Sequence, residues 1–167
     1  MSREQLALRL VSEESGINGM RVRQGLYTEA EEQLLMDAVG QISDLPLYVD
    51  DTPRINLSQL RSKARRLQTY VGLDLLIVDY LQLVTLGGNK RYNRVEEVTE
   101  ITAALKGLAR DLDIPLIALS QLNRMSEGRI DHRPQLSDLR DSGSIEQDAD
   151  TVLFLFREEM HHQEDDW

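Results

Sequence analysis

A carboxylate and an amide each follow an apolar stretch of this chain. Asp79 ends the run "LLIVD", and Gln121 follows "IPLIALS". A carboxylate fixed at the end of a dry strand suits the binding of Mg²⁺, often through water, as a Walker B aspartate does. An amide at the end of an adjacent strand could sense a γ-phosphate or orient a water molecule. Both patterns are short, and they leave open a loop-capping aspartate and a surface glutamine.

Two other groups of polar residues could bind ions. The aspartate pair 50–51 suggests the acidic pocket of a phosphoacceptor domain, but the hydroxyl and the lysine of such a pocket do not follow later strands in the expected order. The histidine pair 161–162 lies beside acidic residues and could bind a metal adventitiously, although a solvated tail is the simpler interpretation. Nothing resembles a nucleophilic triad.

The segment 137–150, "SDLRDSGSIEQDAD", combines a glycine, a basic residue and hydroxyls. A loop of this composition can bind an anion with a side chain and backbone N–H groups. The whole chain is acidic, with 29 acidic and 19 basic residues and a net charge of −10. That balance argues against a free-standing nucleic-acid binder, which needs a basic surface. Basic residues nevertheless cluster at 61–66, 90–94 and 124–133. Such clusters are typical of solvated helix faces and loops.

The composition is that of one globular domain. A chain of 167 residues can bury a proper core. It has no cysteine, which excludes disulfides and thiolate metal sites and fits a cytoplasmic protein. No apolar run approaches the roughly 18 residues of a membrane span, and the start lacks the features of a signal peptide.

Local patterns predict the elements that position these residues. Capping boxes at Ser2 and Thr28 predict two helix starts. Apolar residues at helical spacing predict a helix after Thr28 and further helices over 57–67 and 95–112. Short apolar runs predict strands over 46–51, 74–80, 114–121 and 151–156.

Continuous apolar strands separated by helices indicate an α/β fold with a parallel sheet covered on both faces. In such sheets ligands bind at the carboxyl ends of the strands. Six residues are therefore expected along one edge: Asp50, Asp51, Asp79, Ser120, Gln121 and Arg157.

Four segments, in order and spacing, resemble the DnaB family of bacterial replicative hexameric DNA helicases: "DDTP" (50–53), "VDYLQL" (78–83), "PLIALSQLNR" (115–124) and "SDLRDSGSIEQDAD" (137–150). The resemblance runs from Met1 to about Arg157. It implies a RecA-like three-layer fold, with a mostly parallel sheet flanked by helices, that binds ATP and Mg²⁺. It also implies a homo-hexameric ring that moves along single-stranded DNA and works with primase and a helicase loader.

The resemblance assigns roles to individual residues. It implies that Asp79 is the Walker B ligand of Mg²⁺ and that Gln121 senses the γ-phosphate, so that both serve catalysis and ATP binding. Arg140, Asp141 and Gly143 match the central-channel loop that holds the DNA backbone; the alternative is that Arg140 pairs with a nearby carboxylate and shapes a turn. A ring needs few cationic groups per subunit on its axis, so an acidic chain is compatible with DNA binding.

The chain departs from the family in what it lacks. No G-x-x-x-x-G-K-[ST] occurs, so there is no P-loop to cradle phosphates. In the family, the P-loop and the catalytic glutamate precede the residues that match Met1. We therefore expect residues 1–157 to form a partial RecA-like motor domain, inactive alone, followed by an acidic, disordered tail over 158–167. A non-catalytic RecA-like ring partner and another RecA-like recombination-type ATPase are the alternatives.

Overall fold

The computed structural model describes residues 1–88, 93–123, 129 and 131–158, with the backbone alone at 140–143. These residues form two compact units, Met1–Thr52 (the helical unit) and Pro53–Trp167 (the sheet unit). Each unit is described by itself.

The helical unit contains three helices, α1 (Arg3–Ser15), α2 (Gly19–Gln24) and α3 (Glu29–Ser43). Both predicted capping boxes are confirmed: the Ser2 hydroxyl accepts from the Gln5 N–H at 3.3 Å, and the Thr28 hydroxyl accepts from the Glu31 N–H at 3.3 Å. The short helix α2 was not predicted. Its signals were an asparagine N-cap at Asn18 and a C-terminal glycine.

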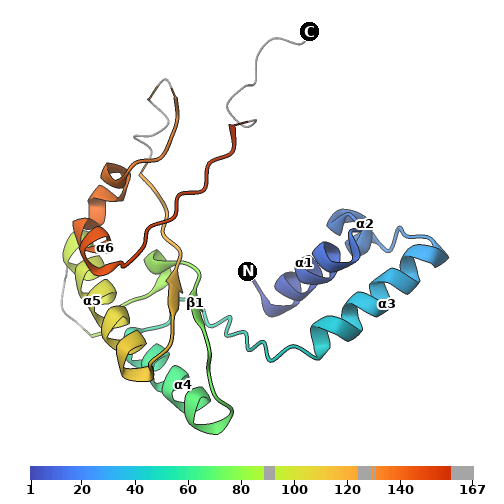
Figure 1. Cartoon of the computed structure of the whole chain (residues 1–167), viewed down its shortest axis with the longest axis horizontal. Helices are drawn as coiled ribbons and strands as arrows, with labels where there is room; N and C mark the ends of the chain where they lie inside the picture. The colour runs from blue at the N-terminus through green and yellow to red at the C-terminus, as the bar shows by residue number, and fades with distance from the viewer. Residues whose placement is uncertain (89–92, 124–128, 130, 159–167) are drawn as a thin grey trace. The chain divides into compact units, whose positions relative to one another are not determined.

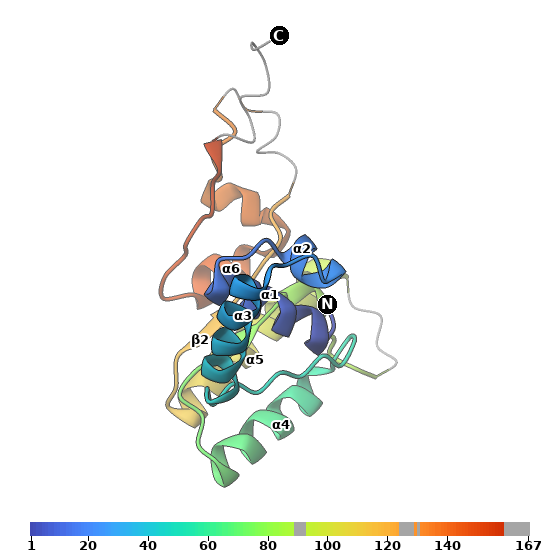
Figure 2. The same cartoon turned by 90° about the vertical axis from the view of Figure 1, so that its right-hand side faces the viewer.

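The sheet unit alternates helices and strands: α4 (Leu57–Tyr70), β1 (Leu76–Val78), the 3-10 helix η1 (Leu81–Leu83), α5 (Arg94–Leu112), β2 (Leu116–Ala118), the 3-10 helix η3 (Leu136–Ser142) and α6 (Gly143–Asp148). Strands β1 and β2 pair in parallel, with Leu76 opposite Leu116 and Val78 opposite Ala118. The crossover between them runs through α5, which packs alongside β2 (Figures 1 and 2). This is the βαβ connection that a parallel pair requires.

The core of the sheet unit lies between the two strands and helices α4 and α5. Its buried residues are Leu57, Leu60, Ala64, Val78, Leu81, Val84, Ile101, Leu105 and Leu108. On the opposite face of the strands, Ile77 and Ile117 are 55% and 51% exposed. Within the described residues of the sheet unit, α4 and α5 therefore cover one face of the two strands.

Two of the four predicted strands are wrong, and the other two are shorter than predicted. Residues 46–51 and 151–156 have no strand assignment. Several of their apolar side chains are exposed, among them Leu153 at 85% and Leu155 at 91%. A strand requires a hydrogen-bonded neighbour as well as an apolar pattern, and no neighbouring strand pairs with either segment in the described part of the chain.

These missing strands also remove the basis for three of the predicted edge positions, Asp50, Asp51 and Arg157. Asp50 accepts hydrogen bonds from the N–H of Thr52 at 3.1 Å and from its hydroxyl at 2.5 Å, an arrangement typical of an Asx turn. Asp51 pairs with Arg3 at 3.3 Å within the helical unit. No strand precedes Arg157 either.

Over the described ranges, no helix is both long enough and apolar enough to cross a membrane. The predicted disordered tail falls almost entirely on residues 159–167, outside the described residues.

Candidate active site

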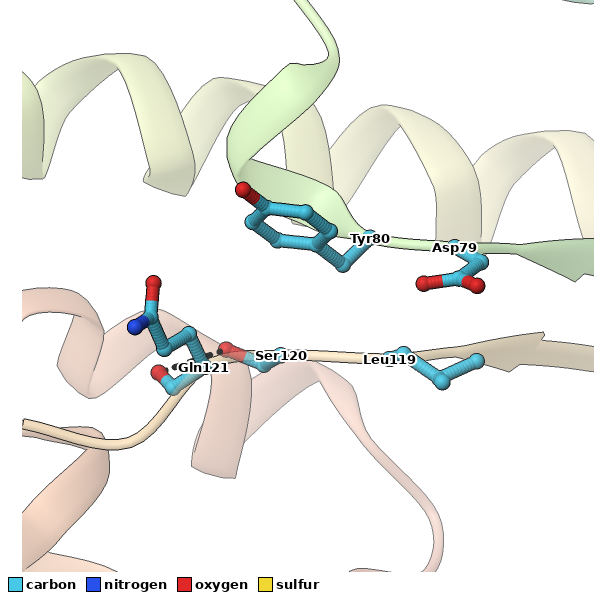
Figure 3. A pocket seen from close by; sticks show the side chains of 5 residues that line it. All are labelled: Asp79, Tyr80, Leu119, Ser120 and Gln121. Atoms are coloured by element: carbon cyan, nitrogen blue, oxygen red, sulfur yellow. Dashed lines mark hydrogen bonds between the residues drawn. The ribbon is translucent and has the colours of Figure 1, made fainter. Parts of the chain in front are cut away.

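A shallow hollow of about 390 Å³ opens at the carboxyl ends of β1 and β2. It is lined by Asp79, Tyr80, Leu119, Ser120 and Gln121 (Figure 3). The strand register explains why they meet: Val78 lies opposite Ala118, so the residues that follow each strand emerge at one edge of the sheet. The structure thus brings Asp79, Ser120 and Gln121 together, as the sequence predicted.

The main chain around Asp79 is held on both sides. The Leu119 N–H donates to the Val78 carbonyl at 2.9 Å, and the Leu81 N–H donates to the Leu119 carbonyl at 2.9 Å. Val78 and Leu81 are themselves buried in the core. The peptide bond between Asp79 and Tyr80 is cis. Asp79 is an exposed carboxylate, and the two hydrogen bonds and the buried Val78 and Leu81 anchor the backbone around it.

The two predicted catalytic side chains are available to a ligand. Figure 3 shows the carboxylate of Asp79 and the amide of Gln121 pointing into the space between the two chain segments, with the Tyr80 ring beside them. Both residues are exposed, and no side chain of the described residues binds either of these groups. A free carboxylate and a free amide at one sheet edge suit a bound anion with its cation.

Gln82 is a polar contact of this edge to which the sequence analysis assigned no role. Its Nε2 donates to the Ser120 Oγ at 3.1 Å and to the Gln121 carbonyl at 3.3 Å. The only local signal was a glutamine between two leucines, in "LQL". Its partners lie 38 and 39 residues away in the sequence, so no local pattern could identify them.

The backbone of the segment "RDSG" is helical, whereas the sequence predicted a loop. Arg140 and Asp141 lie in η3, and Gly143 is the first residue of α6. Leu139, just before this segment, is buried, and η3 packs against α5 and α6. The segment thus sits at the junction of two short helices.

The sequence on the N-terminal side of this junction is anchored by a buried carboxylate. Asp138 is 2% exposed, pairs with Arg129 and accepts from the Gln135 N–H at 2.8 Å. Its own carbonyl accepts from the Asn123 N–H at 3.1 Å. The hydrogen bond from the Arg129 guanidinium holds the pKa of Asp138 below its usual value.

Two contacts anchor the C-terminal side to α5. The Thr102 hydroxyl donates to the Asp148 carboxylate at 2.5 Å, and Thr102 is buried. Lys106, one turn further along α5, forms an ion pair with Asp150. The acidic residues of "SDLRDSGSIEQDAD" therefore hold the segment in place from both sides.

Comparison with known proteins identifies the family. The family model described as the DnaB-like helicase C-terminal domain matches residues 1–167. This chain belongs to that family. The replicative DNA helicase DnaB of Geobacillus stearothermophilus is 46% identical over 98% of the chain, and the replicative DNA helicase DnaC of Bacillus subtilis is 47% identical over 98%. The chain spans about a third of the length of these relatives, 36% of each.

Two solved structures have the same fold. The ATPase domain of G40P superposes with a TM-score of 0.90 at 34% identity, covering 99% of this chain and 59% of that one. A DnaB-like replicative helicase, studied with its primase interactions, superposes with a TM-score of 0.91 at 33% identity, covering 100% of this chain and 41% of that one. The predicted α/β fold of the DnaB-like ATPase domain is thereby confirmed.

The residues at the carboxyl edge of the sheet fit a Mg²⁺ ion that is bound together with a nucleotide. Mg²⁺ keeps several waters and commonly takes one or two carboxylates plus phosphate oxygens. In the parts of the chain that the structure describes, no group of three or more acidic or histidine side chains could hold a metal by itself. The single exposed carboxylate of Asp79 supplies a hard oxygen ligand of the right kind, beside a hollow that a phosphate can enter.

The Asp138 anchor predicts a pH-dependent contribution to stability. The folded-state pKa of Asp138 is lowered, so its contribution is fully present above the ordinary aspartate pKa of about 3.9 and is lost as the pH falls through the folded-state value. We expect Asp138→Asn to lower Tm by roughly 5 °C at pH 7. The difference from the parent should shrink below about pH 4.

Thermal unfolding between pH 3 and pH 7 measures this effect. Asp74→Asn is the matched control, because Asp74 is exposed and undergoes the same chemical change. A Tm difference for Asp138→Asn that stays constant across this range would show that the ionised carboxylate does not anchor the segment.

Proposed function

We propose that this chain forms part of the ATP-driven motor of a replicative DNA helicase, working in the cytoplasm. The motor couples ATP hydrolysis to movement along single-stranded DNA and to unwinding of the duplex. The observation that carries the proposal is the exposed pair Asp79 and Gln121 at the carboxyl edge of the sheet of a DnaB-like domain. Fold alone does not assign a function, so the site residues carry the argument.

Each site residue has a role in this proposal. Asp79 binds Mg²⁺ directly or through water, and the buried residues Val78 and Leu81 on either side fix its position. The cation, when bound with ATP, neutralises charge on the phosphate oxygens. The Gln121 amide, which has both donor and acceptor atoms, contacts the γ-phosphate or orients the attacking water. ATP and Mg²⁺ are thus the proposed cofactors.

The proposal assigns the DNA contacts to the segment between the two anchors. The Arg140 side chain binds a phosphate of single-stranded DNA, and the main chain at Asp141 and Gly143 lies along the same strand. Such contacts are independent of base sequence, as translocation requires. The proposed assembly is a homo-hexameric ring, with a primase and a helicase loader as further partners; a solved relative is described with its primase interactions.

A chimera tests the proposal. This chain replaces the matching segment of the Geobacillus stearothermophilus helicase, to which it is 46% identical. We expect the chimera to hydrolyse ATP, to be stimulated by single-stranded DNA and to unwind a forked duplex. A chimera that assembles and binds DNA without hydrolysing ATP would instead support a non-catalytic ring partner.

The 167-residue chain alone is expected to show no ATP hydrolysis above a no-enzyme blank. It contains no P-loop sequence to surround the β- and γ-phosphates with backbone N–H groups and a lysine. Turnover by the isolated chain that Asp79→Asn abolishes would contradict this expectation.

A further inference from the structure

Gln82 joins the two chain segments that follow β1 and β2. Its side-chain amide donates from Nε2 to the Ser120 Oγ at 3.1 Å and to the Gln121 carbonyl at 3.3 Å. Its Oε1 lies 3.4 Å from the Gln121 N–H, as a long hydrogen-bond acceptor. One side chain therefore engages both polar main-chain groups of Gln121.

These contacts begin where the main-chain pairing of the strands ends. The last backbone bond between the two segments runs from the Leu81 N–H to the Leu119 carbonyl, at 2.9 Å. Beyond this point, at Ser120 and Gln121, the two segments are joined by hydrogen bonds from the Gln82 side chain. Without it, the main chain at Gln121 would have to exchange these bonds for water.

Gln82 is itself held from a third element. Its carbonyl accepts from the Nη2 of Arg94 at 3.2 Å, and Arg94 also pairs with Glu97 at 2.6 Å. Arg94 is the first residue of α5, the helix that packs against the core. Gln82 is half-buried and follows the buried Leu81, so its backbone has little freedom to move.

We infer that Gln82 is a positioning residue that fixes the main chain of Gln121, so that the Gln121 amide reaches into the hollow beside Asp79. The inference rests on the proposed function for the role of Gln121 itself. Gln82 binds the main chain of Gln121. The side chain of Gln121 is left to point into the hollow (Figure 3). Misplacement of a reacting group by about 1 Å is enough to slow a reaction strongly.

The kinetic test uses the chimeric helicase and the variant Gln82→Leu, which removes the amide and keeps a side chain of similar size. We expect kcat for DNA-stimulated ATP hydrolysis to fall roughly tenfold, with KM for ATP changed less than about twofold. Gln121→Ala should slow hydrolysis at least as much. Gln33→Leu is the matched control, since Gln33 is exposed on α3 and its amide donates to Asp37 at 2.9 Å.

The double variant separates positioning from general stabilisation. If Gln82 acts through Gln121, then Gln82→Leu in the Gln121→Ala background should cause no further loss of kcat. Losses that multiply would show that Gln82 acts independently and would overturn the inference. A normal kcat for Gln82→Leu, where Gln121→Ala is slow, would overturn it too.

Amide hydrogen exchange in the 167-residue chain gives a readout that does not depend on activity. In Gln82→Leu, the Gln121 N–H should exchange roughly tenfold faster, while the Leu119 N–H, bonded to Val78 at 2.9 Å, should keep its rate. An unchanged rate at Gln121, or faster exchange at both positions, would overturn the inference. An inactive parent chimera would count against the proposed function alone, and the exchange rates would still decide the role of Gln82.

Discussion

Replacing Asp79 with asparagine in the chimeric helicase is expected to lower the turnover number for ATP on the order of a thousandfold. Asparagine keeps the shape of the side chain and removes the charge that attracts Mg²⁺. Asp79 is exposed and binds no side chain of the described residues, so the loss of its charge should leave folding almost unchanged. We therefore expect a large loss of turnover together with a Tm within about 2 °C of the parent.

Steady-state ATP hydrolysis with saturating single-stranded DNA, measured over a range of Mg²⁺ concentrations, checks this result. Asp74→Asn is the matched control, because it makes the same change at an exposed aspartate of the same unit. It should hydrolyse ATP like the parent. Near-normal turnover by Asp79→Asn at every Mg²⁺ concentration would show that Asp79 is not the metal ligand.

The parts of the fold that sequence predicted well depend on interactions between near neighbours. The capping boxes at Ser2 and Thr28 join residues three positions apart, and their side-chain types are enough to specify the bonds. Helix α5 was predicted over 95–112 and spans Arg94–Leu112, because its apolar stripe is long and regular.

Prediction failed where the outcome depends on what lies beside a segment. The run "TVLFLF" at 151–156 has the apolar character of a strand, yet it has no strand assignment. The run at 46–51 has no strand assignment either, and Asp50 forms a local turn with Thr52 there. In both segments an apolar pattern indicates the capacity to pair, whereas pairing itself needs a neighbour of matching register.

In the candidate site, too, some contacts could be predicted from the sequence and others could not. The meeting of Asp79 with Gln121 was predictable, because parallel strands place their carboxyl ends at one edge. The contacts of Gln82 were not, because its amide binds Ser120 and Gln121, which follow the next strand and lie 38 and 39 residues away in the sequence. The ion pair between Asp138 and Arg129 could not be predicted either. Both residues belong to a polar stretch whose few apolar residues give no local pattern.

The second large effect concerns DNA binding by the segment between the anchors. Arg140→Ala in the chimeric helicase is expected to weaken single-stranded DNA binding roughly tenfold at physiological salt, for every base sequence alike. The reason is that an arginine bound to a phosphate releases a condensed counterion. The plot of log affinity against log salt should therefore become shallower by about 0.7 for each phosphate that the variant no longer neutralises.

The competing interpretation is that Arg140 pairs with a nearby carboxylate, Asp138, Asp141 or Glu146, and only shapes the turn. Of these, Asp138 already binds Arg129 and the Gln135 N–H. If the role of Arg140 were structural, Arg140→Ala should lower Tm or disturb ring assembly and leave the salt dependence unchanged. A contact with DNA predicts the reverse: a shallower salt dependence, with Tm and ring assembly close to those of the parent.

A salt titration of binding to a labelled oligonucleotide, with parent and variant side by side, distinguishes the two. Arg23→Ala is the control, since Arg23 is an exposed arginine on α2 in the helical unit. It should keep the affinity and the slope of the parent. An unchanged slope for Arg140→Ala, or a loss of affinity that follows a loss of Tm, would assign the position to the turn. A shallower slope at unchanged Tm and ring size would assign it to the DNA strand.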